Sequence, residues 1–511
     1  MKAWLFILVL FFARLVVAQS YFNTSLIHGP HRVGFKAGVH YDLGRPAIRE
    51  QFSAFRKGRA VHISVWYPAV VKANHQTMLF SEYVDEISRT VNPMQVSKKT
   101  RTRSVEQMNT ILAQFGGDSI LLKKHLPLML SSSTKAFRNA ASRSGEYPVI
   151  IYPESAYLNS ILCEYLASYG YIVVSVSRHG TQDAEFEWQS IRGIETLVQD
   201  CQFALSIIRK EFNPGSGVAV MGTGMNASAG LAWMMRNPAI SALVSLEGGI
   251  LTGYEYGLIQ QSPYFNAAAV TRPMLVIHSP HMAVDPVLIR RYKYADRFMI
   301  NLPGMREFYY LNFGVWEKSI PGILGAAPGD TKTSFEWMAR YALFFLDWQL
   351  KNGYEGKTFF SETPEQHGVP SGLMTFSVLP RQDVPPTHAE LLTIKDEDGF
   401  HAMLREVKKF QREDSLVFSV ETYASIGQSL IAEKAFREGT EWAESFRTIF
   451  PNAVIAHTLA GRCLLELGSK QEATAMYTMA LRLLPADLYV PPAEKEKLKS
   501  AIEQRLQQLT Q

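Results

Sequence analysis

The chain has 511 residues, of which 47% are hydrophobic and 19% are charged, so it is long enough for more than one domain and can bury a large core. Its formal net charge is +5 and its pI is near 8.8. The lysines and arginines are scattered among acidic residues and form no tract or aromatic-interleaved stripe. This distribution argues against a nucleic-acid partner, and the composition argues against a largely disordered chain.

The N-terminus has the pattern of an export signal. Lys2 precedes a short apolar run, and a Val-Val-Ala tripeptide stands just before Gln19. The run is too short for a spanning helix, which needs about 20 apolar residues, and Arg14 interrupts it. We therefore expect residues 1–18 to be a cleaved signal peptide, and the protein to be secreted or periplasmic with no stable membrane span. An uncleaved N-terminal anchor is the alternative.

Cysteine usage gives no disulfide framework. The three cysteines are an odd number and few for an exported chain, and two of them fall within apolar helical patterns. We expect buried, unreactive thiols at Cys163, Cys201 and Cys463.

Strand and helix patterns alternate over most of the chain. Alternating apolar and polar residues at 60–68 predict an early strand that stops at Pro68. Residues from about 74 to 144 mix charges with helical periodicity and predict an inserted helical cap. Further strands are predicted at residues 148–152, 171–176, 218–221, 242–246 and 274–277, and helices at 159–169, 191–211, 227–236 and 338–351. Continuous apolar strands are typical of a parallel sheet that is buried on both faces, so we expect an α/β fold with three layers.

A proline-containing stretch at residues 379–386 predicts a domain boundary. It separates a first domain over 19–380 from a smaller all-α domain over 387–511.

The second domain contains a repeat. Gly427 and Gly461 are 34 residues apart (461 − 427), and the same offset relates Leu430 to Leu464 and Pro451 to Pro485. This period, over about 420–485, resembles the tetratricopeptide repeat. The resemblance implies paired helices and a possible groove for a protein or peptide partner. Only two units match, and an ordinary helical bundle is the alternative.

The strand at 218–221 runs into Met221-Gly222-Thr223-Gly224-Met225-Asn226, and a helix with small residues follows. This context is that of the nucleophile turn Gly-x-Ser-x-Gly, in which a strained bend lifts a serine above the sheet. Aligned on Gly222, the nucleophile position is Gly224, which has no attacking side chain. Thr223 and Ser228 are alternative hydroxyls, but each is displaced from the apex of the turn.

Residues from about 29 to 353 resemble the platelet-activating-factor acetylhydrolase and dienelactone-hydrolase-like branch of the α/β-hydrolases. The resemblance rests on the order and spacing of Val61–Ala69, Glu164–Tyr171 and Phe344–Lys351. It implies a mostly parallel α/β-hydrolase sheet and an ester-hydrolysing triad of nucleophile, acid and histidine.

Carried over position by position, this resemblance leaves a degenerate triad. Glu247 occupies the place of the acid, and Tyr310, in a Tyr-Leu-Asn-Phe segment, occupies the place of the histidine. A tyrosine with a pKa of about 10 is a poor base near neutrality. In other branches the acid follows the strand at 274–277, where Met282 stands in its place and Asp285 is the remaining nearby carboxylate.

The oxyanion loop is also altered. After the strand at 148–152 the chain reads Pro153-Glu154-Ser155-Ala156, so backbone amides of Ser155, Ala156 and Met225 remain as donors. Glu154 adds a negative charge where negative charge would develop, which opposes oxyanion stabilisation. The loop pair His278 and His281 with Asp285 is weak evidence for metal binding, and we expect no metal and no cofactor.

Three hypotheses about function follow. The first is an exported hydrolase homologue that has lost serine-hydrolase catalysis and binds a small acyl or lipid-like ligand or a protein partner. The second is an active esterase, a carboxylic-ester hydrolase with a displaced nucleophile or with water activated by Glu247. The third is an assembly scaffold in which the repeats are primary.

Overall fold

A computed structural model describes residues 21–46, 58–91, 98–114, 117–178, 187, 190–282, 284–412 and 414–510. The predicted signal peptide, residues 1–18, lies outside these ranges. No helix within them is long and apolar enough to cross a membrane. The chain forms two compact units. The first comprises the chain up to Ile259 together with Arg272–Arg290 and Asp296–Pro380, and the second comprises Gln260–Thr271, Arg291–Ala295 and Arg381–Gln511.

The first unit is built on one mixed, mostly parallel sheet. Its strands are β1 Arg32–Asp42, β2 Arg59–Val70, β3 Ala136–Arg138, β4 Ala141–Ser142, β5 Val149–Ile151, β6 Ile172–Val176, β7 Val218–Thr223, β8 Ile240–Leu246, β9 Met274–His278, β10 Arg297–Asn301 and β11 Thr375–Leu379. The order across the sheet is β11-β10-β9-β8-β7-β5-β6-β2-β1-β3, and β4 pairs with β2. From β6 to β10 all pairs are parallel, whereas β1–β2, β2–β6 and β10–β11 are antiparallel.

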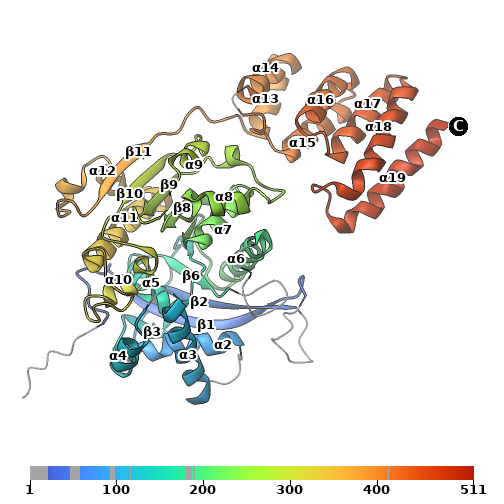
Figure 1. Cartoon of the computed structure of the whole chain (residues 1–511). Helices are drawn as coiled ribbons and strands as arrows, with labels where there is room; N and C mark the ends of the chain where they lie inside the picture. Colours follow the sequence, from blue (N-terminus) through green and yellow to red (C-terminus); the bar gives the residue numbers. More distant parts are fainter. Residues whose placement is uncertain are drawn as a thin grey trace, which may run out of the picture. The chain divides into compact units, whose positions relative to one another are not determined.

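Helices cover both faces of this sheet (Figure 1). The helices of the first unit are α2 Phe80–Val91, α3 Lys98–Gln114, α4 Ser119–Ser131, α5 Ala156–Ser168, α6 Ile191–Phe212, α7 Met225–Met234, α8 Gly253–Ile259, α9 Pro286–Arg291, α10 Phe313–Trp316, α11 Thr331–Lys351 and α12 Tyr354–Phe359. Helices α5 and α11 pack together on one face, and α6, α7 and α8 pack together on the other. The predicted three-layer α/β sandwich with a mostly parallel sheet is confirmed.

The edges of the sheet differ from the sequence prediction. The strands β1, β10 and β11 were not expected from their residue patterns. The prediction that the early strand stops at Pro68 is wrong, because β2 continues to Val70. Proline has no backbone N–H for the ladder, but its carbonyl still accepts a hydrogen bond from the Arg143 amide at 2.8 Å. The strand therefore passes the proline without an unpaired donor.

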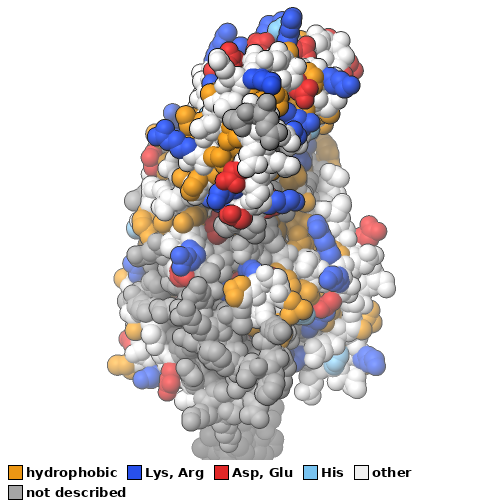
Figure 2. All heavy atoms as spheres, turned by 90° about the vertical axis from the view of Figure 1, so that its right-hand side faces the viewer, with side chains coloured by type: hydrophobic (Ala, Val, Ile, Leu, Met, Phe, Trp, Pro, Cys, Tyr) orange, Lys and Arg blue, Asp and Glu red, His pale blue; other side chains and the backbone are white. Residues whose placement is uncertain are grey.

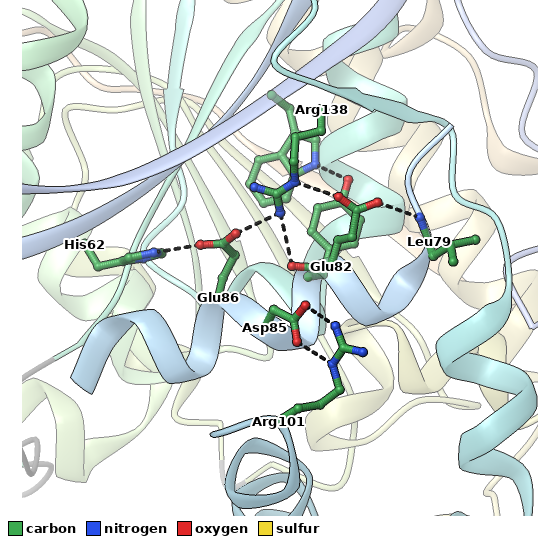
Figure 3. Close-up of polar contacts among 9 residues, drawn as sticks. His62, Leu79, Glu82, Asp85, Glu86, Arg101 and Arg138 are labelled. Carbon is green, nitrogen blue, oxygen red and sulfur yellow. Dashed lines mark hydrogen bonds and ion pairs between the residues drawn. The ribbon is translucent and has the colours of Figure 1, made fainter. Parts of the chain in front are cut away.

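The insert expected over about 74–144 contains α2, α3 and α4 together with the short strands β3 and β4. Figure 3 shows the polar cluster that joins its first helix to the sheet. Glu86 of α2 lies 3.1 Å from Nε2 of His62 on β2 and accepts from Arg138 on β3 at 2.8 Å. Arg138 also donates to Glu82 at 2.7 Å. Burial alone would raise the pKa of Glu86, but His62 and Arg138 outweigh burial and lower it.

A second buried chain of hydrogen bonds joins the same helix to α5. The Trp66 indole donates to the Tyr83 hydroxyl at 2.8 Å, and Tyr83 donates to Glu164 at 2.6 Å. The other oxygen of Glu164 accepts from the Lys135 amide at 2.9 Å. Burial raises the pKa of Glu164 to about 7, although these donors partly oppose the rise. The folded protein therefore holds the proton on Glu164 more tightly than the unfolded chain does.

This difference predicts a pH-dependent stability. The free energy of unfolding should fall as the pH rises from about 4.5 to about 7, because only the folded state keeps the Glu164 proton in that range. Glu164→Gln should remove that part of the fall, on the order of 3 kcal/mol. Urea unfolding at pH 5 and pH 8 measures it. The exposed Glu106→Gln on α3 is the control, and equal pH dependence in wild type and Glu164→Gln contradicts the assignment.

The second unit contains a helical array. Its helices are α13 His388–Asp398, α14 Phe400–Gln411, α15 Val420–Ala432, α16 Phe436–Ile449, α17 Val454–Glu466, α18 Lys470–Leu483 and α19 Pro492–Thr510. Helices α15 and α17 begin 34 residues apart (454 − 420), and so do α16 and α18 (470 − 436). Figure 2 shows acidic and basic side chains interspersed over the visible face of these helices.

The glycines of this array mark close helix contacts. A Cβ at Gly427 would lie 2.7 Å from a methyl carbon of Leu459, and a Cβ at Gly461 would lie 3.1 Å from the Tyr477 ring. Both glycines therefore permit packing that a larger residue would push apart. Cys463, on α17, is a buried free thiol like Cys163 and Cys201, which confirms the expectation of buried, unpaired cysteines.

Candidate active site

Strand β7 ends at Thr223 and α7 begins at Met225, so a single residue makes the turn between them. Gly224 has φ 54° and ψ −127°, a conformation that strains any residue with a side chain. Its amide donates to the Leu246 carbonyl and its carbonyl accepts from the Ala227 amide, both at 3.0 Å. The backbone thus has the sharp strand-to-helix bend of a nucleophile turn.

The glycines at and near the turn differ in how much space surrounds them. A Cβ at Gly222 would lie within 3.0 Å of the backbone of Asn226 and Ala227, and one at Gly249 would lie within 3.0 Å of Gly224. Only glycine fits at these two supporting positions. A Cβ at Gly224 would meet no heavy atom within 4 Å. The place that a nucleophile would occupy is open and has no side chain.

The neighbouring hydroxyls are poorly placed to act in its stead. The Thr223 hydroxyl lies 2.9 Å from the Tyr152 hydroxyl and hydrogen-bonds with it. Ser228, on α7, is 0% exposed, and its hydroxyl has no hydrogen-bond partner among the described residues. A substrate from solution cannot reach a hydroxyl that is buried in this way, and the geometry therefore argues against Ser228 as a nucleophile.

The residues at the acid and base positions, Glu247 and Tyr310, are both buried. Glu247 is 4% exposed and has φ 58°, a strained angle for a residue with a side chain. The Ser279 hydroxyl lies 3.4 Å from its carboxylate. Tyr310 is 0% exposed, and burial raises the pKa of its hydroxyl well above the usual value. The charge of Glu247 adds to this rise and Ser279 partly opposes it.

Tyr310 is thus kept protonated at neutral pH. It can donate a hydrogen bond, but it cannot remove a proton from a nucleophile or a water molecule. Tyr310 lies close enough to Glu247 for the charge of that carboxylate to act on its hydroxyl. The two residues stand at the positions that the alignment gives to an acid and a base, and Tyr310 is unsuited to act as a base.

The loop after β9 has a structural role. Asp285 accepts from the Val287 amide at 2.8 Å at the start of α9, and its own amide donates to the Leu251 carbonyl at 2.8 Å. Burial lowers the pKa of His278. No group of three or more histidine, cysteine, aspartate or glutamate side chains suited to a metal ion occurs in the described part of the chain.

The oxyanion loop contains the largest departure from expectation. Glu154 is 3% exposed, and one of its oxygens accepts from the Ser155 amide and from Arg178, each at 2.9 Å. Its other oxygen accepts from the Asn226 side-chain amide at 3.1 Å. Arg178 forms an ion pair with Glu154 and offsets the negative charge that the sequence places in this loop. Ser155, a predicted oxyanion donor, is bonded to the protein's own carboxylate.

The other two predicted oxyanion donors lie at the starts of helices. Ala156 begins α5 and Met225 begins α7, where backbone amides have no partner within the helix. Sequence reasoning missed Arg178 and Ser279. Arg178 stands two residues beyond β6, and Ser279 directly follows β9. Polar residues at the carboxyl ends of parallel strands are the signal that could have identified both.

The two kinds of glycine give a testable contrast. Gly222→Ala should disrupt the turn, because backbone atoms of α7 occupy the place of the new Cβ. Gly224→Ala meets open space and should cost about 1–3 kcal/mol through its backbone angle alone. Urea unfolding compares the two, and Gly253→Ala, which also meets open space, is the control. Equal destabilisation by Gly224→Ala and Gly222→Ala would contradict the open space around position 224.

No protein-family profile matches the sequence. No curated protein matches it either. Among solved structures, the chain is similar to a ferulic acid esterase from Streptomyces cinnamoneus, with 14% sequence identity and a TM-score of 0.46. The similarity covers 69% of this chain and 98% of the esterase.

Proposed function

We propose that this protein is an exported α/β-hydrolase homologue that has lost serine-type ester hydrolysis and acts by binding. Its ligand is a small acyl or lipid-like molecule or a protein partner. The observation that carries the proposal is the turn at Gly224, which keeps the backbone conformation and open space of a nucleophile site but has no nucleophile. The protonated Tyr310 at the base position supports the same conclusion.

The polar groups around the turn also favour binding over catalysis. Thr223 is bonded to Tyr152, and Glu154 is bonded to Ser155 and Asn226. An enzyme of this class leaves its nucleophile and its oxyanion donors available to the reacting carbonyl group. A Cβ at Gly224 would meet no heavy atom within 4 Å, so the protein leaves room for a small group at the apex of the turn.

The proposal predicts that the purified protein does not hydrolyse p-nitrophenyl acetate above the rate of a heat-treated sample. Absorbance of released p-nitrophenol measures this across pH 6 to 9. Turnover that disappears in Thr223→Ala or Ser228→Ala would instead support the active esterase with a displaced nucleophile. Turnover that disappears in Glu247→Gln would support water activated by that carboxylate.

A gain-of-function pair tests the two lost positions together. Gly224→Ser supplies a hydroxyl at the apex, and Tyr310→His supplies a base beside Glu247. We expect the double variant to hydrolyse p-nitrophenyl acetate at least about 100-fold faster than either single variant, because a nucleophile and its general base act as a unit. Equal rates in all three variants would show that more than these two positions was lost.

The third hypothesis, an assembly scaffold, is supported by the equal 34-residue spacing of the helix pairs α15–α16 and α17–α18. This spacing and the close glycine contacts at Gly427 and Gly461 favour a tetratricopeptide-like array. On this reading the helical unit receives a protein or peptide partner. Capture of partners by the full chain and by a chain lacking residues 387–511 separates the two roles: an unchanged set of partners argues against the scaffold.

A further inference from the structure

Three segments that are distant in the sequence meet at the carboxyl ends of the central strands. Glu154 lies in the loop after β5, Arg178 lies two residues beyond β6, and Asn226 lies in the first turn of α7. In a parallel sheet this edge is where ligands bind. The three residues form one buried polar cluster, in which Asn226 is 0% exposed and the Glu154 and Arg178 side chains are 4% and 16% exposed.

The contacts in this cluster are those of a bound carboxylate. One oxygen of Glu154 accepts from the Ser155 amide and from Arg178 at 2.9 Å each, and the other accepts from Asn226 at 3.1 Å. Arg178 donates in addition to the Asn226 side-chain oxygen at 3.4 Å. A guanidinium, a carboxamide and a backbone N–H thus converge on a planar group with two oxygens. Donors of this kind are strong partners of a carboxylate.

We propose that these donors form a carboxylate-binding site, in which Glu154 is a self-inhibiting occupant that the carboxylate of a ligand must displace. The inference rests on the proposed binding role. It specifies the class of ligand, which is a carboxylic acid and not an ester. The exchange conserves charge, because one carboxylate replaces another beside Arg178. The Ser155 amide therefore exchanges its hydrogen bond to Glu154 for one to the ligand and is never left without an acceptor.

The substitutions in the turn and in the loop then have a joint explanation. Asn226 stands where hydrolases of this fold usually have a small residue, and Glu154 stands in the oxyanion loop. Each would be costly alone, since a buried carboxylate or a buried carboxamide needs partners. Together with Arg178 they satisfy one another.

The test removes the Glu154 carboxylate by mutation and supplies acetate as a free carboxylate. Glu154→Ala removes the Glu154 carboxylate from its contacts with Arg178, Asn226 and the Ser155 amide, and we expect a lower melting temperature. Sodium acetate should raise it again in a saturable manner, whereas sodium chloride at equal ionic strength should not. Isothermal titration should detect acetate binding to Glu154→Ala that is at least about tenfold tighter than to wild type, where acetate must first displace Glu154.

Matched variants keep the test decisive. Glu154→Leu fills the space without a charge and should not respond to acetate, and Arg178→Gln in the Glu154→Ala background should weaken acetate binding about tenfold or more. If Glu154→Ala does not fold, Glu154→Ser takes its place, with acetate supplied during refolding. Equal acetate responses in all variants would overturn the proposal. So would acetate binding that Arg178→Gln leaves unchanged, or a failure of acetate to stabilise both Glu154→Ala and Glu154→Ser.

These outcomes are independent of catalysis. Ester hydrolysis by the wild-type protein would overturn the proposed loss of activity and leave acetate binding to Glu154→Ala unaffected. A failure of acetate binding would remove the ligand class and leave the missing nucleophile at Gly224 as it is.

Discussion

A sharp bend carries the chain from β7 into α7, and close backbone contacts hold it in place. Gly222 lies against the first turn of α7, and Gly249 lies against Gly224 itself. The bend is thus fixed by packing at its supporting positions, whereas a side chain at its apex would meet no packed atoms. A hydrolase can lose its nucleophile at such a point without losing its fold, and glycine at the apex even relieves backbone strain.

The same constraint explains why the rest of the site is preserved in outline. Glu247 keeps a strained backbone angle at the end of β8, and Tyr310 is buried where a base would stand. Buried polar groups need partners whether or not they take part in chemistry. The polar side chains near the turn are accordingly bonded to one another, and Glu154, Arg178 and Asn226 are the clearest case.

The sequence predicts the central strands of the sheet but does not predict the strands β1, β10 and β11. Continuous apolar runs such as 218–221 and 274–277 identify buried parallel strands, because both faces of those strands are covered. The edge strand β11 has mostly exposed or half-exposed side chains and gives no such run. Pro68 misled the prediction for β2, since a proline usually ends a strand but its carbonyl can still be paired.

Local motifs located the site but not its contacts. The position of Gly224 follows from the strand-turn-helix order, and the structure places Glu247 and Tyr310 together. The partner of Glu154 did not follow, because Arg178 is 24 residues away along the chain and adjoins it only in the folded sheet. The negative charge of Glu154 is paired only through the tertiary structure, and local sequence patterns do not reveal such a pair.

Intact-mass spectrometry after treatment with a fluorophosphonate probe tests the loss of the nucleophile most directly. The probe forms a stable adduct with an activated serine or threonine hydroxyl, and it requires a working general base. We predict no adduct on the wild-type protein and an adduct at position 224 in the Gly224→Ser, Tyr310→His double variant. A stoichiometric adduct on the wild-type chain, at Thr223, Ser228 or any other hydroxyl, would contradict this prediction.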